Sequence, residues 1–393
     1  MKPAQRIANL PSYPFAALSR RIHELQAQGM DVIRMDIGSP DLPPADFILE
    51  ALERSARDPS HHGYAGFIGI PAFRQAVVDY YRRRFGVELD ATEEVLSLIG
   101  SKEGVAHIAW AFVDPGDLVL VSDPGYPTYS MGTLMAGGEA YPVPLRAENN
   151  WLPDLGAIPP QVADRAVLFW VDYPHNPTGA VAPLSFFEGL VSFARFHDIL
   201  LCHDAPYCDV TFDGYTAPSL LQVDGAKEVT VEFNSLSKAY NMAGWRVGMA
   251  VGNAKAIEAL ALVKSNVDSG LFRPIQEAAA AALTGDQSWV SERNEVYQRR
   301  RDLIWKALDE VGMEAEKPKA TLYLWPRVPE GYTSEGFCTA LLEKQGVSFA
   351  PGSFWGQQGE GYLRISIVQP QERIQEAMER LRRFVRESSR QEH

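Results

Sequence analysis

The chain has 393 residues, of which 46% are hydrophobic and 22% are charged, so it can bury a large core and does not have the composition of a disordered protein. Its 37 Lys and Arg against 50 Asp and Glu give a formal charge of -13, which argues against broad binding to nucleic acid. The three cysteines are scattered and lack CxxC spacing, so we expect neither a disulfide framework nor a metal site.

The N-terminal segment lacks the continuous apolar stretch of a secretory signal, and no later segment is apolar over the length of a membrane span. We therefore expect a cytoplasmic protein without a membrane partner. The Pro-rich stretches 10–15 and 39–44 predict an extended arm that precedes the main core.

Apolar runs alternate with helical patterns between residues 71 and 253. Several of these runs are apolar throughout, as strands buried on both faces of a sheet are. Helices are expected where apolar residues recur every three or four positions, at 104–112 and 184–197. The predicted strands are 94–99, 117–122, 166–172, 199–203, 229–233 and 246–251. The alternation predicts an α/β fold with a mostly parallel sheet.

The pattern changes after residue 276, where a long helical stretch runs to residue 311. Short strands follow at 321–325 and 362–368, and a charged amphipathic helix is predicted at 371–387. These elements predict a second, smaller α+β domain. We expect three parts, with residues 1–45 as an arm and part of the small domain, 46–280 as the large domain and 281–393 as the small C-terminal domain.

Polar and glycine-rich clusters directly follow the predicted strands. They read SKEG, DPGYPTY, DYPHNPTG, HDAPYCD and NSLSKAYNMAGWRVG. In an open parallel sheet such loops gather at one edge, where ligands bind. Neither GxGxxG nor GxxxxGK[ST] occurs, so the usual dinucleotide and P-loop fingerprints are absent.

The segment NSLSKAYNMAGWR carries Lys238 among small hydroxyl residues, with a glycine, a tryptophan and an arginine shortly after it. A single lysine is normally a solvated surface charge, but a catalytic lysine needs a sheltered position where it can lose its proton. The segment resembles the fold-type-I aminotransferases of class I and II. This resemblance implies that pyridoxal phosphate is bound covalently to Lys238, that Arg246 grips its phosphate and that Ser235 contacts the cofactor. It also implies an aspartate-aminotransferase-like large domain that binds the cofactor.

Two further motifs resemble the same family. In HDAPY, the resemblance places Asp204 against the cofactor's pyridine nitrogen and gives Tyr207 a hydrogen bond to its phenolic oxygen. In YPHNPTG, Asn176 would contact the same oxygen and the substrate, and the likeness allows a cis bond before Pro177. Each motif alone would be an ordinary helix cap or turn. The distance of HDAPY from Lys238, and the position of YPHNPTG after a predicted buried strand, favour the functional interpretation.

The likeness also covers the phosphate and the substrate carboxylate. Ser101 and Lys102 begin a predicted helix, whose free N–H groups suit a phosphate, and Tyr126 matches the aromatic residue that stacks on the cofactor ring. Arg364 matches the arginine that holds a substrate carboxylate through two parallel donors. Without the other motifs, Arg364 would be a strand arginine facing solvent.

Weaker likenesses concern the substrate side and the partner subunit. Gly38 matches a substrate-side glycine, while Tyr64 and Ser269 match positions that reach across a subunit boundary, which implies a homodimer. Ser39 replaces a frequent acidic residue, and Pro206 stands where a small residue is usual, so both leave the substrate open.

The resemblance is strongest to LL-diaminopimelate aminotransferases and to relatives that act on alanine, aspartate or methionine. It implies an enzyme that moves an amino group from an L-amino acid to a 2-oxo acid, such as LL-diaminopimelate and 2-oxoglutarate. The sequence leaves open a carbon–sulfur lyase or decarboxylase of the same fold. A regulator with a DNA-binding extension is disfavoured, because the enzyme pattern begins almost at once.

Overall fold

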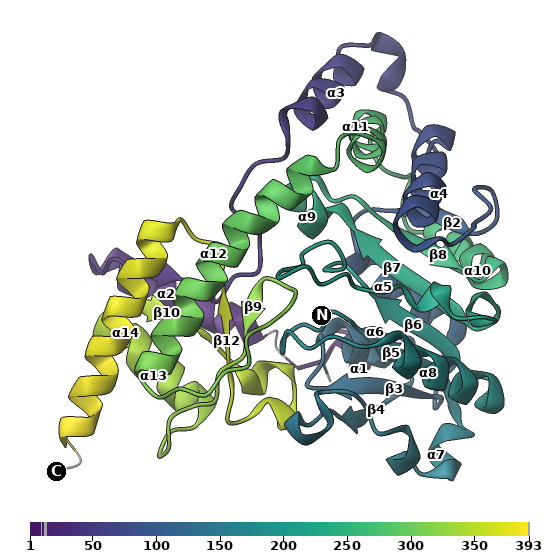
Figure 1. The fold of residues 1–393 in the computed structure, drawn as a ribbon. Coiled ribbons are helices and arrows are strands. Elements are labelled where there is room, and N and C mark those ends of the chain that lie inside the picture. Colours follow the sequence, from purple (N-terminus) through teal and green to yellow (C-terminus); the bar gives the residue numbers. More distant parts are fainter. Residues whose placement is uncertain (9, 12–13, 392–393) are drawn as a thin grey trace.

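The structure is a computed structural model that describes residues 1–8, 10–11 and 14–391. Within these residues, seven strands form one sheet with helices on both faces, and five shorter strands form two small sheets beside it (Figure 1). The predicted α/β fold, with a mostly parallel sheet and a smaller α+β part, is confirmed.

The large sheet has the strand order β2-β8-β7-β6-β5-β3-β4, and β8 alone of the described strands in it runs antiparallel to its neighbours. Its strands are β2 (Val95–Leu98), β3 (Leu118–Asp123), β4 (Glu139–Pro144), β5 (Ala166–Val171), β6 (Leu200–Asp204), β7 (Thr230–Ser235) and β8 (Gly248–Gly252). All six predicted strands are present, with ends shifted by at most two residues. The edge strand β4 was not predicted, because it contains two prolines and is largely exposed.

Helices cover both faces of this sheet, which explains the uninterrupted apolar runs. In β5, Phe169 packs with Phe187 of α8 (Leu184–His197) on one face, while Trp170 packs with Ile108 of α5 (Ser101–Phe112) on the other. Successive side chains of a strand point to opposite faces, so a doubly covered strand must be apolar at every position. Three further helices accompany this layer: α6 (Thr128–Ala136), α7 (Pro160–Ala163) and α10 (Ala254–Ser265).

The predicted continuous helix from 276 to 311 is wrong, since the structure has two helices there. α11 (Arg273–Thr284) ends at Gly285, and α12 (Ser288–Glu310) starts after Asp286, whose carboxylate accepts the backbone N–H of Ser288 at 2.9 Å. Apolar periodicity continues across this break, so it did not reveal the cap. α11 packs on α3 (Asp46–Ala56) and α4 (Pro71–Phe85).

The small sheets bring a segment from the first tenth of the chain beside segments from its last fifth. β1 (Ile33–Arg34) pairs with β10 (Val347–Ser348), and β12 (Leu363–Ser366) lies between β11 (Ala350–Pro351) and β9 (Tyr323–Leu324). Around them lie α2 (Pro14–Ala27), α12, α13 (Ser334–Gln345) and α14 (Gln371–Gln391) (Figure 1). The domain boundaries at 45/46 and 280/281 stay predictions.

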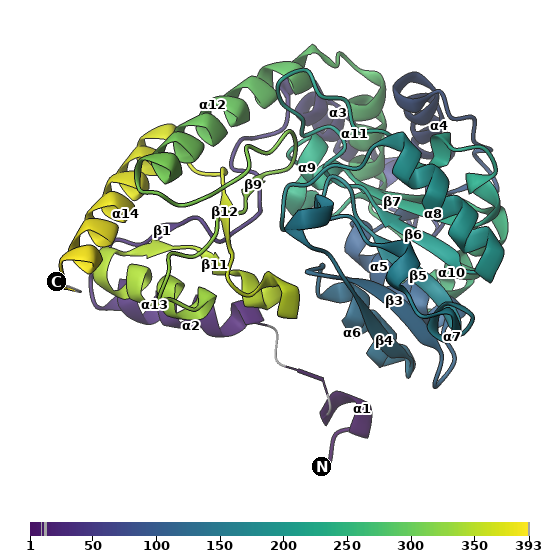
Figure 2. The same cartoon turned by 60° about the horizontal axis from the view of Figure 1, so that its bottom comes forward.

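The arm predicted at 10–15 is wrong at its end, because α2 already begins at Pro14. A proline fits the first turn of a helix, where its missing N–H is not needed. Residues 12–13 lie outside the described residues, whereas 39–44 contain no helix or strand, as predicted. The short helix α1 (Gln5–Ala8) projects from the body of the protein (Figure 2).

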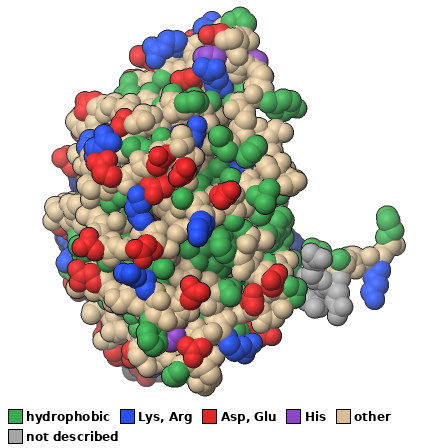
Figure 3. Space-filling view, turned by 90° about the vertical axis from the view of Figure 1, so that its right-hand side faces the viewer, with side chains coloured by type: hydrophobic (Ala, Val, Ile, Leu, Met, Phe, Trp, Pro, Cys, Tyr) green, Lys and Arg blue, Asp and Glu red, His purple; other side chains and the backbone are tan. Residues whose placement is uncertain are grey.

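Several large apolar side chains remain on the surface of this single chain, notably Tyr64 and Ile68, and Val267 and Phe272. The segments 64–68 and 267–272 touch each other, since a Cβ at Gly270 would overlap the backbone near residue 66. Figure 3 shows hydrophobic side chains gathered toward the side where the N-terminal segment projects. Among the described residues, we find no helix with the length and apolarity needed to cross a bilayer.

Candidate active site

A pocket of about 650 Å³ lies where the large sheet meets the small sheets, beyond the carboxyl ends of β5, β6 and β7. It gathers residues from motifs that are up to 326 positions apart in sequence, from Gly38 to Arg364. The predicted site residues that line it are Gly38, Ser101, Lys102, Tyr126, Asn176, Asp204, Tyr207, Ser235, Lys238, Arg246 and Arg364. Tyr64 lies elsewhere, and its side chain is 93% exposed.

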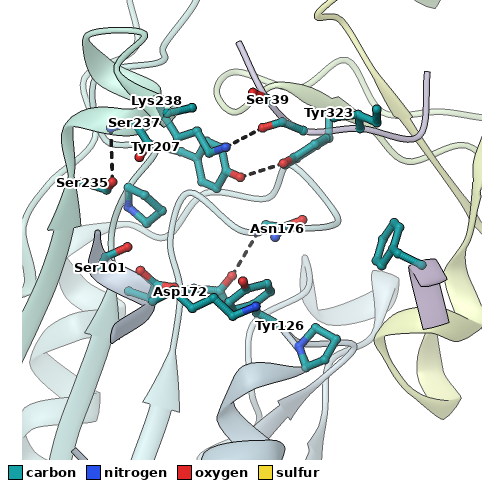
Figure 4. A pocket seen from close by; sticks show the side chains of 18 of the residues that line it. Ser39, Ser101, Tyr126, Asp172, Asn176, Tyr207, Ser235, Ser237, Lys238 and Tyr323 are labelled. Carbon is teal, nitrogen blue, oxygen red and sulfur yellow. Dashed lines mark hydrogen bonds between the residues drawn. The ribbon is translucent and has the colours of Figure 1, made fainter. Parts of the chain in front are cut away.

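Lys238 belongs to the short helix α9 (Leu236–Ala239), which directly follows β7. The hydroxyl of Ser235 caps this helix by accepting the backbone N–H of Ser237 at 3.2 Å. The ammonium of Lys238 donates to the carbonyl oxygen of Gly38 at 2.5 Å (Figure 4). Burial lowers the pKa of Lys238, and the charges of Arg364 and Arg246 lower it further. The amine is thus prepared to lose a proton.

Asp204 is the last residue of β6, and one oxygen of its carboxylate accepts a hydrogen bond. Its Oδ2 accepts the hydroxyl of Tyr129 at 3.0 Å, while Oδ1 is buried without a hydrogen-bond partner among the described residues. Burial raises the pKa of Asp204 to about 6, although Tyr129 and the charges of His203 and Lys238 oppose this rise. A buried oxygen without a partner is costly unless a ligand supplies a donor. Asp204 is therefore suited to accept a hydrogen bond from a ligand N–H.

A second buried carboxyl group, Asp172, lies beside Asp204 and was not foreseen from the sequence. Its Oδ2 accepts the backbone N–H of Asn176 at 3.1 Å (Figure 4). Burial, together with the neighbouring Asp204, raises the pKa of Asp172 well above its usual range. Its Oδ1 lies 3.3 Å from Nε2 of His175, whose pKa burial lowers to about 3. We therefore expect Asp172 to be protonated beside a neutral imidazole.

Arg364 is buried at the boundary between the sheets. Its guanidinium donates to Oδ1 of Asn176 at 2.9 Å and to the carbonyl oxygen of Asp36 at 2.7 Å. It lies over the rings of Tyr323 and Trp355, at 4.1 and 4.3 Å from their centroids. Aromatic faces attract a cation and hold it without consuming its N–H donors. The interpretation of Arg364 as a solvent-facing arginine is thereby excluded.

The opposite end of the pocket presents N–H groups and cations. α5 begins at Ser101, directly after Gly100, whose φ of 72° is left-handed. This φ favours glycine, and the guanidinium of Arg246 lies where a Cβ at residue 100 would stand. The ammonium of Lys102 lies 5.7 Å from the ring centroid of Tyr126. A helix N-terminus flanked by cations suits an anion.

The cis bond allowed before Pro177 is not observed. The cis peptide bonds of the described chain precede Pro124 and Pro174 instead. Every X-Pro bond has access to both isomers, so the sequence alone cannot say which one the surrounding structure selects.

Other pocket residues were missed because their partners are distant in sequence. Tyr129 could have been suspected, since it lies in the same DPGYPTY motif as Tyr126. Tyr323 comes from β9, Trp355 from the 3-10 helix η7 (Gly352–Trp355) and Phe15 from α2, and no local spacing connects them with Lys238.

Comparisons with known proteins agree with this geometry. The sequence profile of aminotransferase class I and II matches residues 30–381. The chain belongs to this family. It is 54% identical to the LL-diaminopimelate aminotransferase of Moorella thermoacetica over 98% of this chain and 99% of that protein. It is 51% identical to the enzyme of that name from Dehalococcoides mccartyi, over 98% of this chain and 99% of that one.

Solved structures give the same result. Substrate-bound BacF from Bacillus subtilis superposes with a TM-score of 0.93 at 37% identity, over 98% of both chains. An aspartate aminotransferase mutant from Thermus thermophilus superposes with a TM-score of 0.92 at 29% identity, over 98% of this chain and 100% of that one. The predicted family is therefore confirmed, and the protein is a pyridoxal-phosphate-dependent aminotransferase.

The pocket fits this cofactor. Asp204 Oδ1 lacks a partner and suits a protonated ring nitrogen, and the start of α5 beside Arg246 suits a phosphate. Lys238 reaches into the space between these two ends. The roles of the individual residues stay predictions.

Proposed function

We propose that this aminotransferase transfers an amino group from LL-diaminopimelate to 2-oxoglutarate. The observation that carries the proposal is the identity of 50% or more, over nearly the whole chain, to several relatives that are named LL-diaminopimelate aminotransferase. The aspartate aminotransferase from Thermus thermophilus is only 29% identical. Alanine, aspartate or methionine as amino donor, and a lyase reaction, remain the alternatives for the experiment below.

Lys238 is the proton-transfer residue in this proposal. When bound, the cofactor withdraws electrons from the substrate and so makes its Cα–H bond acidic. The Nζ of Lys238 removes this proton from Cα and later returns it to the cofactor carbon. Its lowered pKa supports the role, because a neutral amine is the form that accepts a proton.

Asp204 and Tyr207 act on the cofactor ring. The Oδ1 of Asp204 accepts from the pyridine N–H and keeps that nitrogen protonated, while Tyr129 holds the other oxygen. Tyr207 donates to the phenolic oxygen of the ring. Tyr126, which lines the pocket, stacks on the ring face.

The phosphate is assigned to the start of α5 and to the residues around it. Ser101 and Lys102 offer the helix N-terminus and a cation, Arg246 lies beside this helix start, and Ser235 lines the same pocket. The substrate side is assigned to Gly38, Asn176 and Arg364. The guanidinium of Arg364 binds the α-carboxylate of the substrate. Asn176 accepts a hydrogen bond from this guanidinium and so orients both the guanidinium and the carboxylate that it binds.

We also propose a homodimer in which Tyr64 and Ser269 reach the partner's site. The exposed apolar side chains of the segments 64–68 and 267–272 support this interface, since a monomer gains little from exposing them together. We assign the protein to the cytoplasm, which is in keeping with three buried, unbonded cysteines.

The experiment is a substrate panel with purified holoenzyme and 2-oxoglutarate, in which glutamate formation is followed. We expect LL-diaminopimelate to give the highest kcat/KM, well above its meso isomer and above alanine, aspartate and methionine. Pyruvate and ammonia released from cystathionine would identify a lyase. A higher kcat/KM with any other donor would contradict the proposed substrate while leaving the aminotransferase assignment intact.

A further inference from the structure

Tyr323 places a second tyrosine hydroxyl inside the site. It belongs to β9 and is buried, with only 2% of its surface exposed. Its hydroxyl lies 2.7 Å from that of Tyr207, as the dashed line in Figure 4 shows. None of the catalytic motifs contains this residue, and the small sheet brings it to the pocket.

The surroundings of Tyr323 fix its ring and its hydroxyl separately. The ring carries the guanidinium of Arg364 on one face, at 4.1 Å from its centroid. The hydroxyl occupies the place where a Cβ on residue 38 would stand, which explains why that residue is glycine. The carbonyl of the same Gly38 accepts the ammonium of Lys238. Tyr323 therefore touches the groups assigned to the substrate carboxylate and to the cofactor's phenolic oxygen.

We propose that Tyr323 is a positioning residue whose hydroxyl donates to the oxygen of Tyr207 and thereby turns the Tyr207 proton toward the phenolic oxygen of the cofactor. The inference rests on the donor role proposed above for Tyr207.

The direction of this hydrogen bond follows from charge. The guanidinium over the Tyr323 ring draws electron density from it and makes its O–H the stronger donor. Among the described residues, Tyr323 is the hydrogen-bond partner found for the Tyr207 hydroxyl. If the Tyr207 oxygen accepts the proton of Tyr323, the proton of Tyr207 itself is left to bond a ligand. A hydroxyl that accepts one hydrogen bond becomes a better donor in the next. The charged groups that face the pair are Arg364, Lys238 and Asp204.

The experiment compares Tyr323→Phe with Tyr207→Phe and the double variant, each loaded with pyridoxal phosphate. The readout is the pH midpoint at which the visible absorbance of the bound cofactor changes. The phenolic oxygen carries more negative charge after proton loss, so a weakened donor raises this midpoint. We expect Tyr207→Phe to raise the midpoint by about one pH unit or more. Tyr323→Phe should raise it by roughly half a pH unit, the effect of losing one neutral hydrogen bond.

Kinetics separate the hydroxyl from the ring. Phenylalanine keeps the aromatic face under Arg364, so KM for the amino acid should stay unchanged while kcat falls roughly three- to tenfold. Tyr80→Phe is the matched control, because Tyr80 is equally buried and its hydroxyl bonds outside the pocket, to Asp209 at 2.7 Å and to the sulfur of Cys208 at 3.4 Å. It should alter neither the midpoint nor kcat.

The double variant decides how Tyr323 acts. If Tyr323 works through Tyr207, adding Tyr323→Phe to Tyr207→Phe produces no further shift. An additional shift in the double variant, or no shift in Tyr323→Phe alone, overturns the inference. If Tyr207→Phe itself leaves the midpoint unchanged, the proposed role of Tyr207 fails first and the inference fails with it. If Tyr323→Phe does not fold, Tyr323→Gln and Tyr323→Leu replace it. The midpoint of Tyr323→Gln, whose side chain can donate, must then lie closer to the wild-type midpoint than that of Tyr323→Leu. The opposite order shows that the inference is wrong.

Discussion

The ammonium of Lys264 is completely buried and lies 2.9 Å from Oε2 of Glu103, near the start of α5. It also lies 2.9 Å from Oδ2 of Asp268. Glu103 in turn accepts the backbone N–H of Ile99 at 2.6 Å, and Asp268 accepts that of Gly270 at 2.7 Å. One lysine thus connects the helix start assigned to the phosphate with the segment assigned to the subunit interface.

Lys264→Met should destabilise the protein by about 3–5 kcal/mol, because it leaves two carboxylates largely buried without their cation. The measurement is the free energy of unfolding of the apoenzyme in urea. Lys255→Met, at an exposed position of the same helix, is the control and should change it by less than about 0.5 kcal/mol. Equal effects of the two substitutions would contradict a structural role for the buried pairs.

Asp204 should make the apoenzyme less stable as the pH rises from 3.8 to about 6, because burial raises the pKa of this carboxyl group in the folded protein. The folded protein holds a proton there that the unfolded chain has released, so the slope of the unfolding free energy against pH is negative. The loss from this group is at most about 3 kcal/mol.

Asp204→Asn tests whether Asp204 causes this loss of stability. The variant lacks the titrating group, so its unfolding free energy should change less between about pH 4 and 6. Burial still raises the pKa of Asp172 in the variant, but the contribution of the Asp204 charge is lost, so the difference between the two urea-unfolding profiles reports Asp204 together with its effect on Asp172. Parallel profiles would show that Asp204 does not cause the decline. In the loaded enzyme the same variant should lose most of its transamination, because the ring nitrogen loses its anionic partner.

Arg246→Ala should weaken pyridoxal phosphate binding by roughly 100-fold, the effect of losing two charge-assisted hydrogen bonds. Folding should be little affected, because Arg246 is exposed in the structure and bonds only the carbonyl of Ala243 among the described residues. Cofactor affinity is measured by fluorescence titration, with the exposed Arg299→Ala as control. An unchanged affinity would remove Arg246 from the phosphate site.

Subunit mixing tests the shared site. Lys238→Ala subunits would lack the proposed catalytic amine, and Tyr64→Ala subunits would lack the contact that we propose Tyr64 makes with the phosphate in the partner's site. In a mixed dimer, the site that retains Lys238 receives the intact Tyr64 from the other chain, so some activity should return after subunit exchange. Proof of exchange without recovered activity, or an active monomer in sedimentation, would exclude sharing through Tyr64.

Local patterns predicted the parts of this protein that local chemistry determines. The strands covered on both faces must be apolar at every position, and the loops after them carry short motifs, so β5, β6, Asp204 and Lys238 were accessible from sequence. The edge strand β4 faces solvent and therefore lacks that signal. Tyr323 was also hidden, because its importance arises from a contact with Tyr207 across 116 positions.

The hydrogen bond between Arg364 and Asn176 joins a residue of the small sheet to a loop of the large one. Arg364, the residue proposed to bind the carboxylate, therefore belongs to a different part of the fold from Lys238, and its distance from Lys238 depends on how the two parts are oriented. A substitution far from the pocket that rotates the small sheets slightly would misalign the guanidinium with the substrate. Such a substitution would alter KM without touching any residue of the site, so the choice of amino acid can evolve outside the pocket as well as within it.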